Sequence, residues 1–323
     1  MCWWSIQMLE FLDAPPGNRS FALIDVPCMN RPLNFRPPHV SKRKMTPMRY
    51  CLLLISLLSC AKDEAPALAE AVRQTRDITY NNITMKLVIE KPTGTEMDAL
   101  LVYHGTVLYD ANLMSAANNV IDDFKGILDR KDMLIVGVPY PGENMLLGDN
   151  IIYAEAALLW VKNKASQELG ISIKKIFLGG HSQGGYLVTR LNTMHETNGV
   201  IANAPGPFNL VYRCQLEESG QIAAGATCNK LRAAYGTTSA NPNAYMARSL
   251  LTFTRGFRSD ILFVQGLNDS PIQMYSWPVF KQEVNNCTDC KSIRMVEIPG
   301  GEHSSLFMSS VAKAEFNNFI NSR

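Results

Sequence analysis

Long apolar runs and runs of a single charge are both missing from this chain of 323 residues. The stretch Tyr50–Cys60 holds only about nine apolar residues, whereas a helix needs about 20 to cross a bilayer, so we expect no transmembrane helix there. Lys and Arg form no run long enough for a nucleic-acid patch, and the formal net charge is only +2, so we expect no nucleic-acid partner. With 46% hydrophobic and 19% charged residues, the composition is that of an ordinary globular protein.

A short basic cluster at residues 42–44 stands before the apolar stretch Tyr50–Cys60, and small residues follow it. This order is typical of a secretory signal peptide. The segment Leu57–Cys60 reads LLSC and resembles the lipobox of bacterial lipoproteins, whose cysteine becomes the lipid-bearing first residue. We therefore expect a signal peptide at residues 48–59 and a lipid anchor at Cys60. The anchor would hold an exported protein on a membrane, at its periplasmic or cell-surface face.

The segments on either side of this signal are expected to lack a packed core. Residues 1–47 hold scattered prolines and no sustained period, and a start at Met45 or Met48 would give the signal a normal shape. We expect either an unstructured leader or a mis-assigned start there, and a linker at residues 60–76. The alternative is a plain secretory signal that is cut after the small-x-small segment Ala67–Ala69.

Four of the eight cysteines lie beyond the leader and the signal, namely Cys214, Cys228, Cys287 and Cys290. In an oxidising compartment the economical pairing joins Cys214 to Cys228 and Cys287 to Cys290, which closes two local loops. The lone CxxC pair gives only weak evidence for a zinc site, because no second pair or nearby histidine accompanies it. It is also weak as a redox motif, because it does not open a helix after a strand. We expect two disulfides and no metal.

Strand-like and helix-like segments alternate over residues 77–323 without a long linker or repeat, which predicts one domain. An antiparallel hairpin is expected first, because DITY and ITMKLVIE flank Asn81 and Asn82. Apolar runs typical of strands buried on both faces of a parallel sheet follow at Ala99–Tyr103, Met133–Val138, Ile176–Leu178, Val200–Asn203, Ile261–Val264 and Ile293–Ile298.

Helix-sized segments lie between these runs, most clearly at Asn150–Glu168, at Gly184–Met194 and around Phe316. Alternating strands and helices after an antiparallel start predict an α/β fold with a mostly parallel, doubly wound sheet. The interval 205–260 is too long for a simple crossover, so we expect a small cap insertion over the sheet. In such sheets ligands bind outside the carboxyl ends of the strands, directly beneath that insertion.

Glycines surround one serine in the segment Gly180–Gly184, which reads GHSQG. The segment lies between a strand-like run and a helix, so Ser182 falls in a tight strand-to-helix turn. Such a turn strains the serine backbone, and the flanking glycines remove side chains that would collide with neighbouring elements. A GxSxG string also occurs by chance in chains of this composition. Its place between a strand and a helix is what indicates a nucleophile.

A serine nucleophile needs a base to take its proton and a carboxylate to orient that base. Of the five histidines, His303 follows the last strand-like run in a glycine-rich loop, and therefore leaves the sheet at the same edge as Ser182. Asp269 follows the Ile261–Val264 run at this edge, whereas Asp260 precedes that run. We expect Ser182 as nucleophile, His303 as general base and Asp269 as orienting acid. The alternatives are a merely solvated His303 and an Asp269 that caps the following helix.

Attack on a carbonyl creates an oxyanion, which two backbone N–H groups have to stabilise. Gln183, directly after the serine, is expected to supply one of them. The second is expected from the loop after the Ala99–Tyr103 run, where Gly105 allows a sharp turn and Thr106 is the candidate donor.

The segments GHSQGGYL, QGLND and PGGEHS together resemble those of α/β-hydrolases, more narrowly the catalytic domain of the prolyl oligopeptidase group and related esterases. The resemblance extends from Ile78 to the end of the chain and implies the α/β-hydrolase fold. It also implies Ser182, Asp269 and His303 as catalytic residues, without a metal or an organic cofactor. Two features depart from the pattern: no propeller domain precedes the hydrolase domain, and HGT replaces a fuller HGGP or HGGG loop.

These residues together predict a serine hydrolase that cleaves carboxylic esters through an acyl-enzyme intermediate, with a small ester or a short peptide as its substrate. Cleavage of peptide or amide bonds, as in the prolyl oligopeptidase group, is one alternative. The other is a surface lipoprotein that keeps the hydrolase fold as a binding module without turnover.

Overall fold

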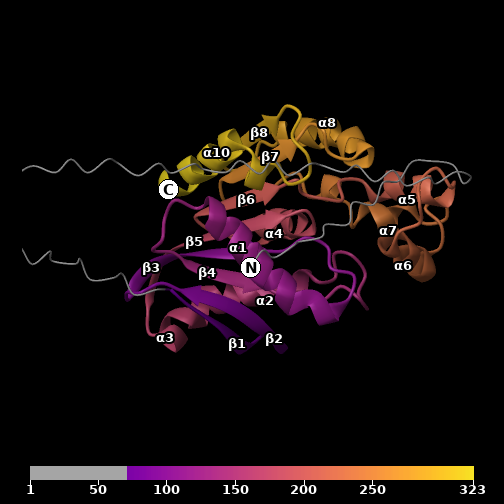
Figure 1. Cartoon of the computed structure of the whole chain (residues 1–323). Coiled ribbons are helices and arrows are strands. Elements are labelled where there is room, and N and C mark those ends of the chain that lie inside the picture. The colour runs from indigo at the N-terminus through magenta and orange to yellow at the C-terminus, as the bar shows by residue number, and fades with distance from the viewer. Residues whose placement is uncertain (1–70) are drawn as a thin grey trace, which may run out of the picture. The chain divides into compact units, whose positions relative to one another are not determined.

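The computed structural model describes residues 71–323, which Figure 1 draws as a coloured ribbon. The expected leader, the signal peptide and the lipid anchor at Cys60 lie outside the described residues. Among residues 71–323, no helix is both long enough and apolar enough to span a membrane.

The described residues form one sheet of eight strands in the order β1-β2-β4-β3-β5-β6-β7-β8. The strands are β1 (Val72–Tyr80), β2 (Ile83–Lys91), β3 (Glu96–Tyr103), β4 (Leu134–Val138), β5 (Ser172–His181), β6 (Gly199–Asn203), β7 (Ile261–Gly266) and β8 (Ile293–Ile298). Strands β3 to β8 run parallel to one another, while β1 and β2 form an antiparallel hairpin and β2 pairs antiparallel with β4. This arrangement confirms the predicted sheet and its antiparallel N-terminal hairpin.

The sequence indicates the hairpin turn clearly, but it does not indicate where β1 begins. Asn81 and Asn82 close the turn with φ angles of 48° and 63°, a conformation that asparagine tolerates well. Strand β1 begins at Val72, so residues 72–76 pair with β2 and do not belong to a linker, contrary to the expectation for residues 60–76. Edge strand β1 has mostly exposed polar side chains and an ion pair from Arg73 to Glu90, so its first half carries little hydrophobic signal.

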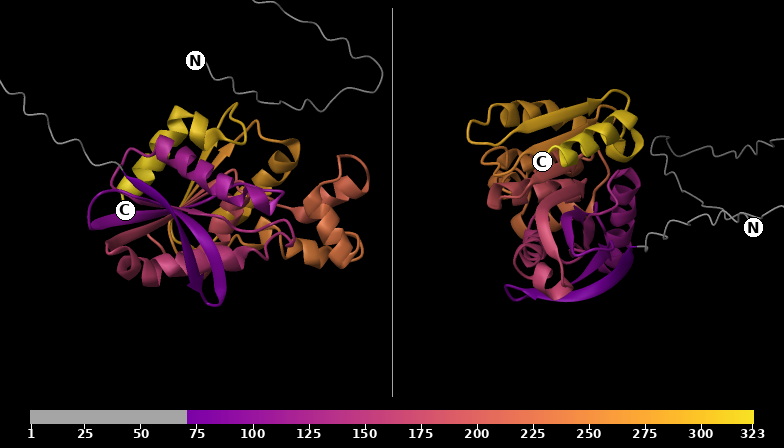
Figure 2. Two further views of the ribbon diagram at one scale, coloured as in Figure 1. Left: turned by 60° about the horizontal axis from the view of Figure 1, so that its bottom comes forward. Right: turned by 90° about the vertical axis from the view of Figure 1, so that its left-hand side faces the viewer.

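Helices cover both faces of the sheet (Figures 1 and 2). Along β3, Leu100 and Val102 belong to the apolar core that also contains residues of α1 and α10. Leu101 and Tyr103 belong to the core that contains residues of α2, α4 and α8, as the alternation of side chains along a strand requires. The helices outside the cap are α1 (Leu113–Ile127), α2 (Ile151–Trp160), α3 (Ser166–Leu169), α4 (Gln183–Met194), α8 (Pro271–Asn285), α9 (Ser305–Met308) and α10 (Ser310–Asn321). A π-helical turn, Val161–Ala165, joins α2 to α3 within the long helix expected there.

The interval between β6 and β7 contains the cap, residues 205–260, whose helices gather at one end of the sheet (Figure 2). They are α5 (Leu210–Glu218), α6 (Ala226–Tyr235) and α7 (Pro242–Met246), and they enclose a small apolar core of their own. A disulfide between Cys214 and Cys228 joins α5 to α6. A second disulfide joins Cys287 to Cys290, so both predicted pairings are present.

Candidate active site

A cavity of about 550 Å³ lies at the carboxyl ends of the parallel strands. Ser182 follows β5, Asp269 follows β7 and His303 follows β8, and all three line this cavity. The cap helices α5 and α6 contribute Arg213 and Thr227 to the lining, next to residues 206–209 at the start of the cap. Because β5, β7 and β8 run in the same direction, residues far apart in the sequence meet at one edge of the sheet.

Ser182 occupies a strained turn between β5 and α4. Its φ of 55° and ψ of −116° are rarely adopted by a residue with a side chain. Its N–H donates to the carbonyl oxygen of Asn203 over 2.9 Å, which anchors the turn to β6. A Cβ at Gly180 would lie 2.2 Å from the carbonyl oxygen of Gly184, and one at Gly184 would lie 2.0 Å from that of Tyr103. The flanking glycines therefore allow both the turn and the close packing of α4 against β3.

The imidazole of His303 contacts the carboxylate of Asp269, with 2.7 Å between Nδ1 and Oδ2. Because an ionised carboxylate only accepts hydrogen bonds, Nδ1 carries the proton and Nε2 of the neutral ring remains an acceptor. Burial raises the pKa of the Asp269 carboxyl, but hydrogen bonds from His303 and Gln265 outweigh burial, so this pKa lies below its ordinary value. Asp269 is therefore ionised at neutral pH and can orient the imidazole.

Asp269 does not cap the helix that follows it. Ser270 is the N-cap of α8, and its hydroxyl accepts a hydrogen bond from the N–H of Gln273. The second carboxylate oxygen of Asp269 accepts from the N–H of Ser270 over 2.6 Å, which fixes the carboxylate further. Asp260 precedes β7 and pairs with Arg323, so it belongs to the opposite end of the sheet.

A second imidazole, that of His181, packs beside His303 with 4.9 Å between the ring centroids. The N–H of Leu306 donates to Oδ1 of Asn203, which turns the amide nitrogen of Asn203 towards Nδ1 of His181 at 2.8 Å. Burial, followed by the neighbouring His303, lowers the pKa of His181 to about 4. His181 is therefore neutral near pH 7, with its Nδ1 already occupied as an acceptor.

The loop after β3 is held by two buried rings, those of His104 and Tyr140, which stack with 4.1 Å between their centroids. Nδ1 of His104 donates to the carbonyl oxygen of Gly105 over 2.7 Å. The Tyr140 hydroxyl donates to the carbonyl oxygen of His104 and, over 3.4 Å, to that of Gly105. Because the N–H of a trans peptide points away from its C=O, these bonds direct the Thr106 N–H away from the two rings.

Of the two expected oxyanion donors, Gln183 directly follows Ser182, and Thr106 belongs to a loop that passes close to Ser182 at Gly105. Gln183 is the first residue of α4, where backbone N–H groups have no acceptor within the helix. Thr106 lines the cavity, and a Cβ on the preceding Gly105 would lie 3.5 Å from the Cβ of Ser182.

The residues that support Ser182, Asp269 and His303 were not among those predicted from the sequence. Gln265 and Asn203 are fully buried amides at the ends of apolar strands. Their position within apolar strands was the signal available in the sequence, because a buried amide needs hydrogen-bond partners. His195, at the end of α4, pairs with Glu155 over 2.7 Å and does not line the cavity.

Comparisons with known proteins give matches among solved structures, while no family model and no curated protein matches the chain. A truncated carbohydrate esterase from gut microbiota matches with a TM-score of 0.59 and 14% identity, over 79% of this chain and 97% of the other. The hyperthermophilic esterase of the archaeon Pyrobaculum calidifontis matches with a TM-score of 0.55 and 16% identity, over 78% and 84%.

A peptidase shares the same architecture. The acylaminoacyl peptidase of Pyrococcus horikoshii matches with a TM-score of 0.55 and 13% identity, over 79% of this chain but only 41% of that protein. At sequence identities of 13% to 16%, the similarity to these structures shows the fold alone. Together with the sheet topology, it establishes the predicted α/β-hydrolase fold.

Proposed function

We propose that this protein is a serine hydrolase that cleaves carboxylic esters through an acyl-enzyme intermediate. The observation that carries the proposal is the 2.7 Å contact between His303 Nδ1 and Asp269 Oδ2, in the cavity that Ser182 also lines. A protonated Nδ1 leaves Nε2 of His303 free to take the proton of the Ser182 hydroxyl. The esterases among the structural neighbours support the same chemistry.

In the first half of the cycle, Oγ of Ser182 attacks the ester carbonyl while Nε2 of His303 takes its proton. The imidazolium then protonates the leaving alcohol as the ester bond breaks, and ionised Asp269 stabilises the positive charge. In the second half, His303 takes a proton from the water that attacks the acyl-enzyme and returns it to Ser182. Both halves use the same nitrogen atom.

We assign stabilisation of the oxyanion to the backbone N–H groups of Gln183 and Thr106. The position of Gln183 at the N-terminus of α4 supports the first assignment, because the helix dipole favours negative charge there. The hydrogen bonds from His104 and Tyr140 support the second, because they fix the peptide plane that carries the Thr106 N–H.

Peptide or amide cleavage is the second candidate, which the peptidase among the structural neighbours favours. Hydrolysis of short-chain para-nitrophenyl esters, compared with that of proline-containing amides, separates the two. We expect a higher kcat/KM for the esters and loss of turnover in Ser182→Ala. A clear preference for the amides would replace the ester proposal, and a binding module on this fold would cleave neither.

We also propose that the protein is exported and lipid-anchored through Cys60. The two disulfides support export, since such bonds persist in oxidising compartments. Mass spectrometry of the mature N-terminus is expected to find a lipid-modified Cys60. An unmodified chain that begins at Glu70 would contradict the anchor.

A further inference from the structure

We infer that the natural substrate carries a carboxylate on its acyl or alcohol part, and that Arg213 of the cap binds it. This inference rests on the proposed ester hydrolysis and defines the substrate class of the same cavity. Arg213 lies on α5 and lines the cavity together with Ser182. Within the described part of the chain, no other Lys or Arg lines it, so Arg213 supplies its permanent positive charge.

Arg213 is held in place by Glu217, one helical turn further along α5. Nε of Arg213 donates to Oε1 of Glu217 over 3.2 Å, and Oε2 of Glu217 accepts from the N–H of Gly225 over 2.8 Å. The Glu217 side chain is only 1% exposed, so a buried carboxylate fixes one edge of the guanidinium. Nη1 and Nη2 of Arg213 have no hydrogen-bond partner among residues 71–323, so their N–H groups remain for a ligand.

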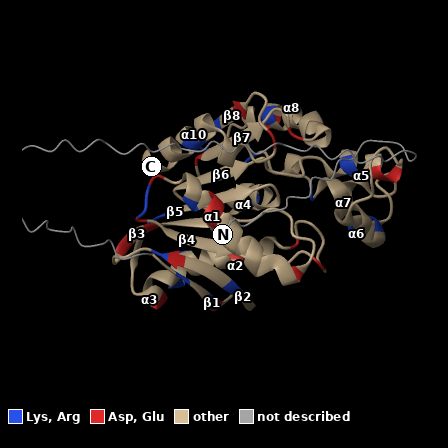
Figure 3. Ribbon diagram, in the orientation of Figure 1, with Lys and Arg blue, Asp and Glu red and all other residues tan. Residues whose placement is uncertain are grey.

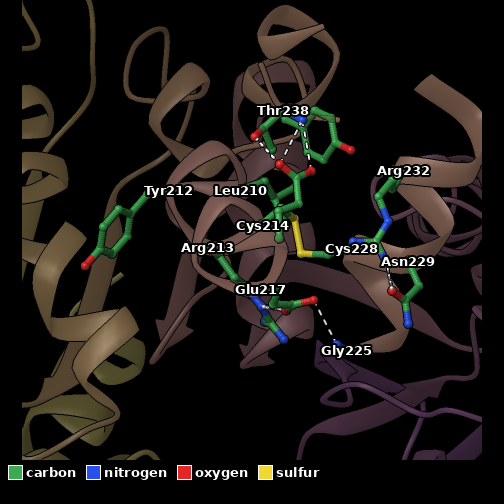
Figure 4. Close-up of a disulfide and its surroundings, with 12 residues drawn as sticks. Leu210, Tyr212, Arg213, Cys214, Glu217, Gly225, Cys228, Asn229, Arg232 and Thr238 are labelled. Atoms are coloured by element: carbon green, nitrogen blue, oxygen red, sulfur yellow. Dashed lines mark hydrogen bonds and ion pairs between the residues drawn. A yellow bond between two sulfur atoms is a disulfide. The ribbon is translucent and has the colours of Figure 1, made fainter. Parts of the chain in front are cut away.

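The disulfide between Cys214 and Cys228 ties together the two cap helices that contribute to the cavity (Figure 4). Arg213 directly precedes Cys214, Thr227 directly precedes Cys228, and both residues line the cavity. The cap is therefore a cross-linked frame that presents one guanidinium before the substrate arrives, which reduces the entropy lost on binding.

The remaining charges in the cavity direct an anionic group towards the cap. Asp269 pairs with His303, and Glu302, directly next to His303, also lines the cavity. A substrate carboxylate is repelled beside these acids and attracted to Arg213. Helix α5 carries both signs of charge (Figure 3), but its Glu217 is buried, pairs with Arg213 and does not line the cavity. The ester bond can then face Ser182 while the acid group faces α5.

A guanidinium suits a carboxylate better than a neutral acceptor. Its planar fork can offer two N–H groups to two oxygens, and such charge-assisted hydrogen bonds are roughly twice as strong as neutral ones. With Nε engaged by Glu217, Nη1 and Nη2 of Arg213 can form this pair. The volume of about 550 Å³ suits a small acidic ester.

Two matched pairs of substrates test the inference on the full chain. For the acyl side, mono-para-nitrophenyl adipate is compared with para-nitrophenyl adipamate, which replaces the acid by an amide of the same shape. For the alcohol side, meta-acetoxybenzoate is compared with meta-acetoxybenzamide. In at least one pair we expect kcat/KM to be about tenfold higher for the acid, mainly through KM. This ratio should fall towards one in Arg213→Gln.

Further variants separate binding from folding. Because Arg213→Gln leaves the buried Glu217 unpaired, the double variant Arg213→Gln/Glu217→Gln removes both charges and keeps a neutral hydrogen bond. Arg213→Lys keeps the charge but loses the fork, so an intermediate ratio is expected. The matched control is Arg232→Gln, since Arg232 lies on α6, contacts Asn229 and does not line the cavity (Figure 4). It should keep the wild-type ratio.

Two outcomes would overturn the inference: a wild-type protein that prefers neither acid, or a preference that survives unchanged in the Arg213 variants. In both cases the neutral esters would still be cleaved. If wild-type protein cleaves none of the four compounds, the proposed ester hydrolysis fails instead. Cleavage of the neutral esters also shows whether each variant is folded. If the Gln variants misfold, the ratio of kcat/KM for acid and amide in Arg213→Lys, which keeps the ion pair with Glu217, tests the inference.

Discussion

Gly184 lies directly against the backbone of Tyr103, so that a Cβ added at Gly184 would be 2.0 Å from the carbonyl oxygen of Tyr103. Gly184 is the second residue of α4, two positions after Ser182, and Tyr103 is the last residue of β3. The absence of a side chain therefore sets the distance between the helix behind the candidate nucleophile and the loop that carries Thr106.

The substitution Gly184→Ala is expected to lower the free energy of unfolding by about 1–3 kcal/mol or more, because the backbone of Tyr103 cannot turn away as a side chain could. Urea denaturation measures the change. Gly126→Ala on α1 is the control, since a Cβ there meets nothing within 4 Å, and it should leave stability unchanged or slightly raised. Equal losses in both variants would count against the close approach.

The substitution Asp269→Asn is expected to lower kcat by roughly 10³–10⁴-fold with little effect on folding. The amide can donate to Nδ1 of His303, which moves the ring proton to Nε2 and removes the acceptor that the mechanism needs. Asp260→Asn, before the same strand, should leave kcat unchanged. Hydrolysis of para-nitrophenyl acetate provides the measurement, and an Asp269→Asn protein with most of its activity would exclude Asp269 as the orienting acid.

The substitution Tyr140→Phe is expected to lower kcat about tenfold with little change in KM, because it loosens the peptide that presents the Thr106 N–H without removing that donor. Tyr103→Phe is a matched control, because the Tyr103 hydroxyl also donates to a buried carbonyl oxygen, that of Ala154, over 3.1 Å. The control should cost about 1 kcal/mol of stability and leave kcat intact. A similar fall in kcat for both variants would indicate general loosening of the structure.

The pH dependence of stability should report on His104. Burial lowers the pKa of His104 from 6.5 to about 4, although its hydrogen bond to Gly105 opposes the shift. Between pH 6.5 and 4 the unfolded chain binds a proton at this residue and the folded protein does not, so the free energy of unfolding falls as the pH falls. The loss is complete once the pH is below about 4.

His104→Asn keeps a donor for the Gly105 carbonyl and removes the titration. Its free energy of unfolding should therefore fall less steeply between pH 6.5 and 4, by up to about 1.4 kcal/mol per pH unit. Urea unfolding at several pH values measures both slopes. Parallel slopes for the two proteins would show that His104 does not stay neutral in the folded state.

Most of the sheet was predictable because strands buried on both faces appear as unbroken apolar runs, as at Ala99–Tyr103 and Ile261–Val264. The hairpin was predictable from the turn residues Asn81 and Asn82. The first half of β1 was not, because an exposed edge strand held by Arg73 and Glu90 lacks the hydrophobic alternation on which the prediction depends.

Part of the candidate site was likewise predictable from the sequence, and part was not. The placement of Ser182, Asp269 and His303 after parallel strands follows from strand order alone, so the sequence could predict that they share an edge. The contact of Gln265 with Asp269 and the position of Arg213 in the cavity depend on how side chains and the cap pack in three dimensions. No spacing in the sequence encodes these contacts.

Labelling with a fluorophosphonate probe, followed by peptide mapping with mass spectrometry, tests the central proposal most directly. If Ser182 is the nucleophile, the wild-type protein carries a single label at Ser182, His303→Ala is labelled slowly and Ser182→Ala is not labelled. A folded wild-type protein that stays unlabelled, or that carries the label on another residue, would contradict it.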